Sequence, residues 1–97
     1  MDALNGPSLS GDTVPRLPLD LRIRRLQEGL LVMHGERLVE LSESAGFILR
    51  AIAGHRSLAQ VSALLAEEYG ISSDEALEDV TAVVEALHPY GMVELDS

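Results

Sequence analysis

A short stretch near the middle of the chain alternates between hydrophobic and polar positions. Val39 and Leu41 share one face of an extended backbone with Arg37. Leu38 and Glu40 share the opposite face. This period of two is typical of a half-buried β-strand, so we predict a strand over these five residues.

Two more apolar stretches precede this strand, at residues 21–26 and 30–34. Short turn-forming segments separate the three stretches, Gln27-Glu28-Gly29 after the first and Gly35-Glu36 after the second. Strands joined by such short turns pair in an antiparallel sense. The sequence therefore predicts a three-stranded meander whose third strand lies at an edge.

The rest of the chain follows a helical period. Apolar residues recur at steps of three and four over residues 43–53, 58–69 and 73–88. A serine precedes each range as a potential N-cap, and the second and third serines have Gln or Glu three residues later, as in a capping box. These serines are Ser42, Ser57 and Ser72. Gly54 and Gly70 are expected to end the first two helices by adopting positive φ, and residues 92–95 to form a last extended piece.

Three strands followed by three helices belong to the α+β class. We predict a winged-helix-like domain, a three-stranded antiparallel meander followed by a three-helix bundle, over residues 15–97. Residues 1–14 are rich in Gly, Ser and Asp and lack periodicity, so we expect a flexible N-terminal tail.

Composition excludes several classes of function. The chain has 97 residues and no cysteine, which excludes disulfides, thiolate zinc sites and cysteine nucleophiles. No apolar run approaches the roughly 20 residues that span a bilayer, so a cytoplasmic location is expected. The net charge is −9, and residues 42–97 carry ten acids against Arg50 and Arg56. Such a surface repels duplex DNA.

No candidate catalytic or metal site emerges. His34, His55 and His88 lack the spacing of metal ligands, and the serines fit helix caps better than nucleophiles. No glycine-rich phosphate loop is present. We expect a protein that is not an enzyme and needs no metal or cofactor.

An ordered set of residues resembles the PqqD family, small peptide chaperones whose fold is also called the RiPP recognition element. The set comprises Pro18-Leu19, Leu21-Arg22, Leu41, Ser44-Ala45, Ile48-Leu49, Gly54-His55-Arg56-Ser57, Val61, Leu64-Leu65, Tyr69, Asp79-Val80, Leu87 and Gly91-Met92-Val93. It covers about residues 15–95. His34-Gly35-Glu36 replaces a frequent Pro-Glu, and Ala53 replaces a usual acid, which argues against the pyrroloquinoline quinone pathway in particular.

The resemblance implies a non-enzymatic adaptor. Such domains bind the leader segment of a ribosomally made precursor peptide and present it to a maturation enzyme, such as a radical SAM enzyme, a leader protease or a cyclase. The leader would lie as an added strand on the third strand, beside the third helix. Transferred to this chain, the peptide-binding edge is Arg37, Leu38, Val39, Glu40 and Leu41, and the helical wall is Asp79, Val80, Val83, Val84 and Leu87.

Other interpretations stay open for these residues. Val80, Val84 and Leu87 also fit a purely structural core, Arg37 fits a guard against aggregation, and Asp79 fits a solvated helix position. A winged-helix DNA-binding regulator would share the fold, although residues 74–88 hold five acids and no Arg, Lys, Gln or Asn. A dimer paired through its own strand edges is a third possibility.

The edge hypothesis leads to one expected mutational effect. Val39→Pro should abolish peptide binding, provided that the Val39 amide points out of the sheet.

Overall fold

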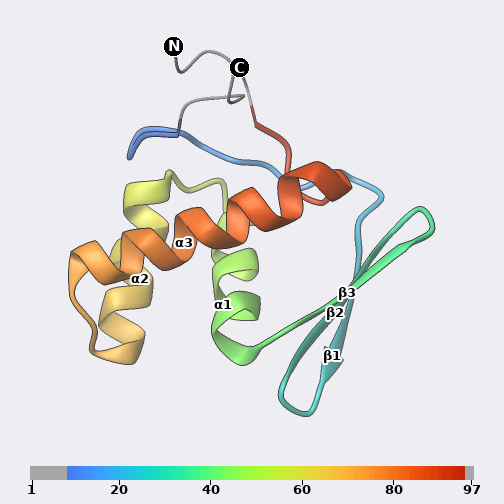
Figure 1. Cartoon of the computed structure of the whole chain (residues 1–97), viewed down its shortest axis with the longest axis horizontal. Coiled ribbons are helices and arrows are strands. Elements are labelled where there is room, and N and C mark those ends of the chain that lie inside the picture. The colour runs from blue at the N-terminus through green and yellow to red at the C-terminus, as the bar shows by residue number, and fades with distance from the viewer. Residues whose placement is uncertain (1–8, 96–97) are drawn as a thin grey trace.

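The computed structural model describes residues 9–95 and confirms the predicted order of three strands and three helices (Figure 1). The elements are β1 (Arg22–Leu26), β2 (Gly29–His34), β3 (Arg37–Leu41), α1 (Glu43–Ile52), α2 (Leu58–Tyr69), α3 (Ser73–Leu87) and the 3₁₀ turn η2 (His88–Tyr90). The strands form one antiparallel sheet in the order β1-β2-β3. In Figure 1, α3 crosses α1 and α2, and the strands extend to one side of the helices. The winged-helix description is a loose one for this arrangement.

The turn between β2 and β3 fixes their register. Only Gly35 of its two central residues has positive φ, at 61°, as in a type II′ turn with glycine first. His34 therefore faces Arg37, and the pairing continues with Val32 opposite Val39 and Leu30 opposite Leu41. The face that carries Val39 and Leu41 is the face turned toward the helices.

The core is aliphatic and lies between this face of the sheet and the three helices. Its buried side chains include Leu30 and Val32 of β2, Leu41 of β3, Ile48, Leu49 and Ile52 of α1, Val61 and Leu65 of α2, and Ala76, Val80, Val84 and Leu87 of α3. Gly46 lets α1 approach β2 closely, because a Cβ there would lie 3.0 Å from Cγ of Leu30. None of the described helices has the length and apolar character needed to span a bilayer.

All three serine caps are present. Ser42 accepts from the Ala45 amide at 3.2 Å, and Ser57 forms a complete capping box with Gln60. Ser72 accepts from the Glu75 amide at 3.1 Å, but within the described residues no return bond from the Glu75 side chain completes this second box.

Of the two glycines predicted to end helices with positive φ, only one does so. Gly70 ends α2 with a φ of 65°, as predicted. The prediction for Gly54 was wrong, because the C-cap of α1 is Ala53, in right-handed geometry, and the residue with positive φ is His55, at 61°. The left-handed position therefore lies one residue later than the glycine suggested.

The predicted tail falls partly outside the described residues, which begin at residue 9. Within the described part, the carbonyl oxygens of Thr13 and Gly11 accept from the Leu58 and Ala59 amides at 2.8 and 3.0 Å. These bonds occupy the first two amides of α2. The boundary between tail and domain at residue 15 stays a prediction.

The last extended piece is shorter than expected. Within residues 92–95, Glu94 forms a single antiparallel bridge with Arg16, through main-chain bonds of 2.7 and 2.9 Å. This bridge ties the two ends of the described chain together.

Candidate functional site: the β3 edge and the end of α3

The outer side of β3 carries unpaired main-chain groups. Over residues 9–95, β3 pairs with β2 alone. A two-residue hairpin loop makes His34 and Arg37 a hydrogen-bonded pair, and such pairs alternate with non-bonded ones along an antiparallel ladder. Val39 is therefore bonded to β2, whereas the amides and carbonyls of Leu38 and Glu40 point away from the sheet.

This geometry corrects the expected effect of Val39→Pro. The Val39 amide points into the ladder with Val32, so the condition on which that expectation depended is not met. Proline at this position would break the sheet itself. The outward amides that another strand could use belong to Leu38 and Glu40.

The side chains of β3 divide between the two faces as the alternation predicted. Leu41 is buried and Val39 is half-buried on the helix-facing side. Leu38 and Glu40 lie on the other face, where Leu38 is 62% exposed. An added strand would thus find an apolar surface on its inner side and solvent on its outer side.

The end of α3 is held beside the start of β3 by a cation–π contact. The guanidinium carbon of Arg37 lies 5.3 Å from the ring centroid of Tyr90 in η2. Sequence analysis missed Tyr90 as part of this site. Its position after Pro89 indicates only a helix end, and a contact with a residue so distant along the chain has no local signature.

The residues of the proposed helical wall on α3 fall into a buried group and an accessible group. Val80 and Val84 are 0% exposed and Leu87 is 2% exposed, so all three lie in the core and have no free surface. Val83 is half-buried and Asp79 is exposed, which leaves these two members with surface that a ligand could contact. Peptide binding by any of the ten predicted residues stays a prediction.

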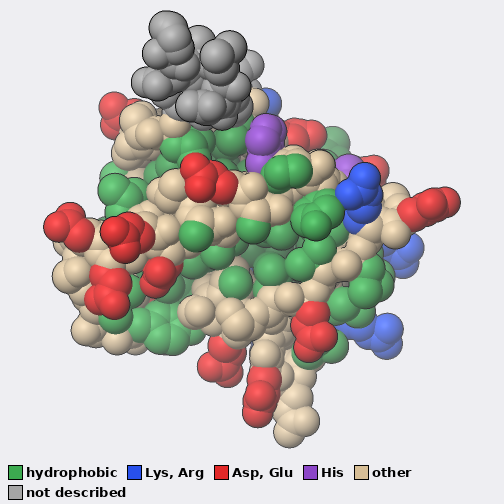
Figure 2. Space-filling model, viewed as in Figure 1, with side chains coloured by type: hydrophobic (Ala, Val, Ile, Leu, Met, Phe, Trp, Pro, Cys, Tyr) green, Lys and Arg blue, Asp and Glu red, His purple; other side chains and the backbone are tan. Residues whose placement is uncertain are grey.

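The exposed surface of α3 is acidic. Asp74, Glu75, Glu78, Asp79 and Glu85 are exposed, and the helix contains no Lys or Arg. Figure 2 shows acidic side chains gathered toward the end of the molecule where α3 begins, and hydrophobic surface between α3 and the strands. A recognition helix with this surface would repel the phosphates of DNA.

The three histidines share no partner among the described residues. Nε2 of His34 lies 3.1 Å from Oδ1 of Asp20, and Nδ1 of His88 lies 3.1 Å from the Val93 carbonyl oxygen. His55 is exposed at the end of α1. Over the described part of the chain, no three His, Asp or Glu side chains come together as metal ligands would.

Comparison with known proteins gives a consistent result. The family model for coenzyme PQQ synthesis protein D (PqqD) matches residues 29–93. A PqqA binding protein of Pseudomonas aeruginosa is 34% identical over 95 residues, covering 92% of this chain and 96% of the relative. A PqqA binding protein of Xanthomonas campestris is 29% identical over 90 residues, covering 91% and 98%.

Two solved structures share the fold. The PqqD truncation of Methylobacterium extorquens PqqCD, described as a stand-alone RiPP recognition element, superposes with a TM-score of 0.79 at 24% identity, covering 90% of this chain and 95% of that one. Lasso peptide synthetase B1, solved in complex with a leader peptide, superposes with a TM-score of 0.74 at 24% identity, covering 84% and 98%.

Proposed function

Because the chain belongs to the PqqD family, we propose that it is a non-catalytic adaptor that binds the leader segment of a ribosomally made precursor peptide. It presents that peptide to a maturation enzyme, either a radical SAM enzyme, a leader protease or a cyclase, and needs no cofactor of its own. Relatives named as PqqA binding proteins support peptide binding. The observation that carries the proposal is the open edge of β3.

The leader docks on β3 as a fourth strand. The main-chain groups of Leu38 and Glu40 supply the ladder bonds, and these bonds are indifferent to the leader sequence. Docking orders a disordered segment at an entropic cost, which side-chain contacts must offset.

Those contacts come from one flank of α3. Asp79 and Val83 are one turn apart on the same side of the helix, and Tyr90 follows near the same side at its end. Tyr90 lies under Arg37 of β3, which supports this flank as the one turned toward the edge. Val39 and Val83 select a medium-sized apolar side chain of the leader, and Arg37 favours an acidic one.

The direct test replaces Leu38 by proline. This change removes an outward amide without breaking a bond to β2, so the domain stays folded and leader affinity falls by roughly tenfold or more. Fluorescence anisotropy measures the affinity, with labelled leader peptides taken from PqqA and from the precursor gene next to this one.

Leu38→Ala is the matched control. It removes the same exposed side chain but keeps the amide, so its Kd stays within about threefold of the parent value. Circular dichroism of both variants checks the fold. Equal affinity of the proline variant and the parent would exclude strand addition at β3, and a dimer mass for the free protein would favour self-pairing of this edge.

A further inference from the structure

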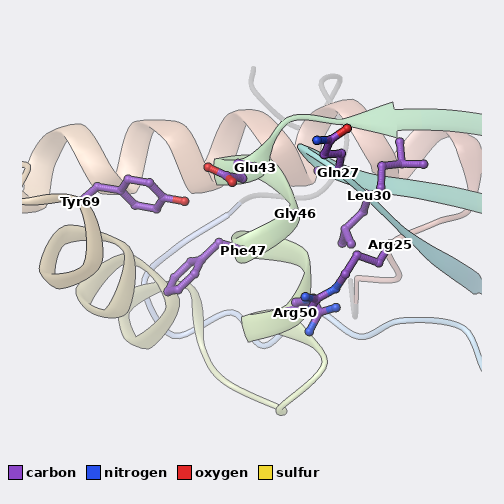
Figure 3. Close-up of a pocket in the computed structure, with 10 residues that line it drawn as sticks. Arg25, Gln27, Leu30, Glu43, Gly46, Phe47, Arg50 and Tyr69 are labelled. Atoms are coloured by element: carbon purple, nitrogen blue, oxygen red, sulfur yellow. The ribbon is translucent and has the colours of Figure 1, made fainter.

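A cleft lies between the β1–β2 hairpin, α1 and the end of α2. It has a volume of about 250 Å³, and its walls include Arg25, Leu30, Glu43, Phe47, Arg50 and Tyr69 (Figure 3). Arg25 lies on β1, the edge strand opposite β3. The cleft is therefore separate from the proposed leader-binding edge.

Backbone geometry brings two arginines together in this cleft. Arg25 is paired with Leu30 across β1 and β2, and Leu30 is the residue against which Gly46 of α1 is closely packed. Arg50 follows Gly46 by one helical turn and so extends from the same face of α1. Figure 3 shows the Arg25 and Arg50 side chains converging at one end of the cleft.

Among residues 9–95, no acidic side chain neutralises this pair. Neither arginine takes part in an ion pair within residues 9–95, although the chain carries 16 acidic residues. Glu43 is on the same face of α1 but seven residues before Arg50, which is about 10 Å along the helix axis. Two neighbouring guanidinium groups repel each other, and a carboxylate between them removes that repulsion and accepts hydrogen bonds from both.

The remaining walls suit a polypeptide better than a free inorganic ion. Phe47 and Tyr69 form an edge-to-face pair with ring centroids 5.8 Å apart, and Leu30 adds aliphatic surface. Glu43 at the other end favours a hydrogen-bond donor such as a main-chain amide. We propose that this cleft binds an acidic segment of a partner protein, with a Glu or Asp carboxylate between Arg25 and Arg50 and an adjacent apolar side chain against the aromatic pair.

The test uses two peptides of matched size, acetyl-Leu-Glu-Glu-Leu-amide and acetyl-Leu-Gln-Gln-Leu-amide. NMR titration follows the Nε–Hε signals of Arg25 and Arg50 in the full chain. We expect saturable shifts with the glutamate peptide and none with the glutamine peptide. Arg25→Gln and Arg50→Gln should each weaken binding by about tenfold or more. Both side chains are exposed and unpaired in the described structure, so these variants should keep the parent melting temperature.

Arg24→Gln is the matched control, because Arg24 is an exposed arginine on the opposite face of β1. The affinity of the Arg24→Gln variant for the glutamate peptide should stay within about twofold of the parent value. An equal loss in Arg24→Gln would overturn the site in favour of diffuse electrostatic attraction. Failure to bind the glutamate peptide, equal binding of both peptides, or saturable shifts with inorganic phosphate alone would also overturn it. Leu38→Pro should leave this titration unchanged, which separates its outcome from that of leader binding.

Discussion

The end of α1 depends on the backbone of His55. Its φ of 61° places a non-glycine residue in the left-handed region, which costs about 1–2 kcal/mol for an L-residue with a Cβ. The His55 amide donates to the Ile52 carbonyl oxygen at 3.0 Å, and its exposed side chain makes no described hydrogen bond. The conformation is therefore imposed by the return of the chain toward α2.

His55→Gly should stabilise the protein. Glycine removes the left-handed penalty but loses about 0.5–1 kcal/mol through greater freedom in the unfolded chain, so we expect a net gain of about 0.5–1 kcal/mol in the free energy of unfolding. Urea denaturation measures this change. Ala53→Gly is the control, because Ala53 has helical geometry with a φ of −60° and should lose about as much as His55→Gly gains. A loss in both variants would show that His55 is not strained.

At the scale of elements, Gly29 lets the first hairpin pack closely against the junction between β3 and α1. Its φ is 142°, and a Cβ built there would collide with the Leu41 carbonyl oxygen, one residue before the Ser42 cap. Gly29→Ala should therefore destabilise the protein by roughly 2–4 kcal/mol, from backbone strain and steric overlap together.

Thermal and denaturant unfolding of Gly29→Ala should be compared with those of Gly35→Ala. Gly35 also has positive φ, but a Cβ there would meet no heavy atom within 4 Å. The Gly35 variant should lose only the conformational term, about 1–2 kcal/mol. If the two variants lose the same stability, the contact with Leu41 contributes nothing to the effect of Gly29→Ala.

The elements were predictable because their signals are local. Strand alternation, helical period and serine caps each span a few residues, and the structure reproduces every predicted strand and helix to within about two residues. The edge position of β3 followed from the short turns of the meander. The prediction that Gly54 has positive φ was wrong because a glycine shows only that positive φ is tolerated at its position. The turn into α2 determines which residue adopts it.

The candidate site was only partly predictable because its remaining features are long-range. Sequence periodicity places Val80, Val83 and Val84 on one apolar stripe, but burial by α1 and α2 decides that Val83 alone keeps free surface. The contact between Arg37 and Tyr90 and the convergence of Arg25 with Arg50 join distant segments. Neither has a pattern that a single sequence reveals.

At the scale of the whole molecule, the two signs of charge are unevenly distributed. Four of the seven basic residues, Arg22, Arg24, Arg25 and Arg37, belong to the sheet, whereas α2 and α3 carry acids and no basic residue. Figure 2 shows the basic side chains of this face gathered on the side of the strands, whereas acidic side chains lie at both ends of the molecule. Residues 21–41, the sheet with its turns, carry four arginines against three glutamates, whereas residues 42–97 carry ten acids against two arginines. An acidic segment is therefore repelled less at the sheet than at the helices, and the paired arginines make the hairpin cleft the most favourable place for it.

The segment of residues 9–14 should contribute to the stability of the whole domain. Removing residues 1–14 deletes the carbonyls of Gly11 and Thr13, which accept from the first two amides of α2, and also Leu9, which packs against the core. The amides of Leu58 and Ala59 then lose their acceptors and the core loses the contact with Leu9, so we expect a loss of about 1–3 kcal/mol in the free energy of unfolding. Removing residues 1–8 keeps every one of these contacts and is the control for chemical denaturation. Because the lost bonds are on α2 and not on β3, the leader Kd of the shorter chain, measured where it is fully folded, should equal that of the parent. A stability equal to that of the control would instead place residues 9–14 outside the cooperative domain, where the sequence first put them.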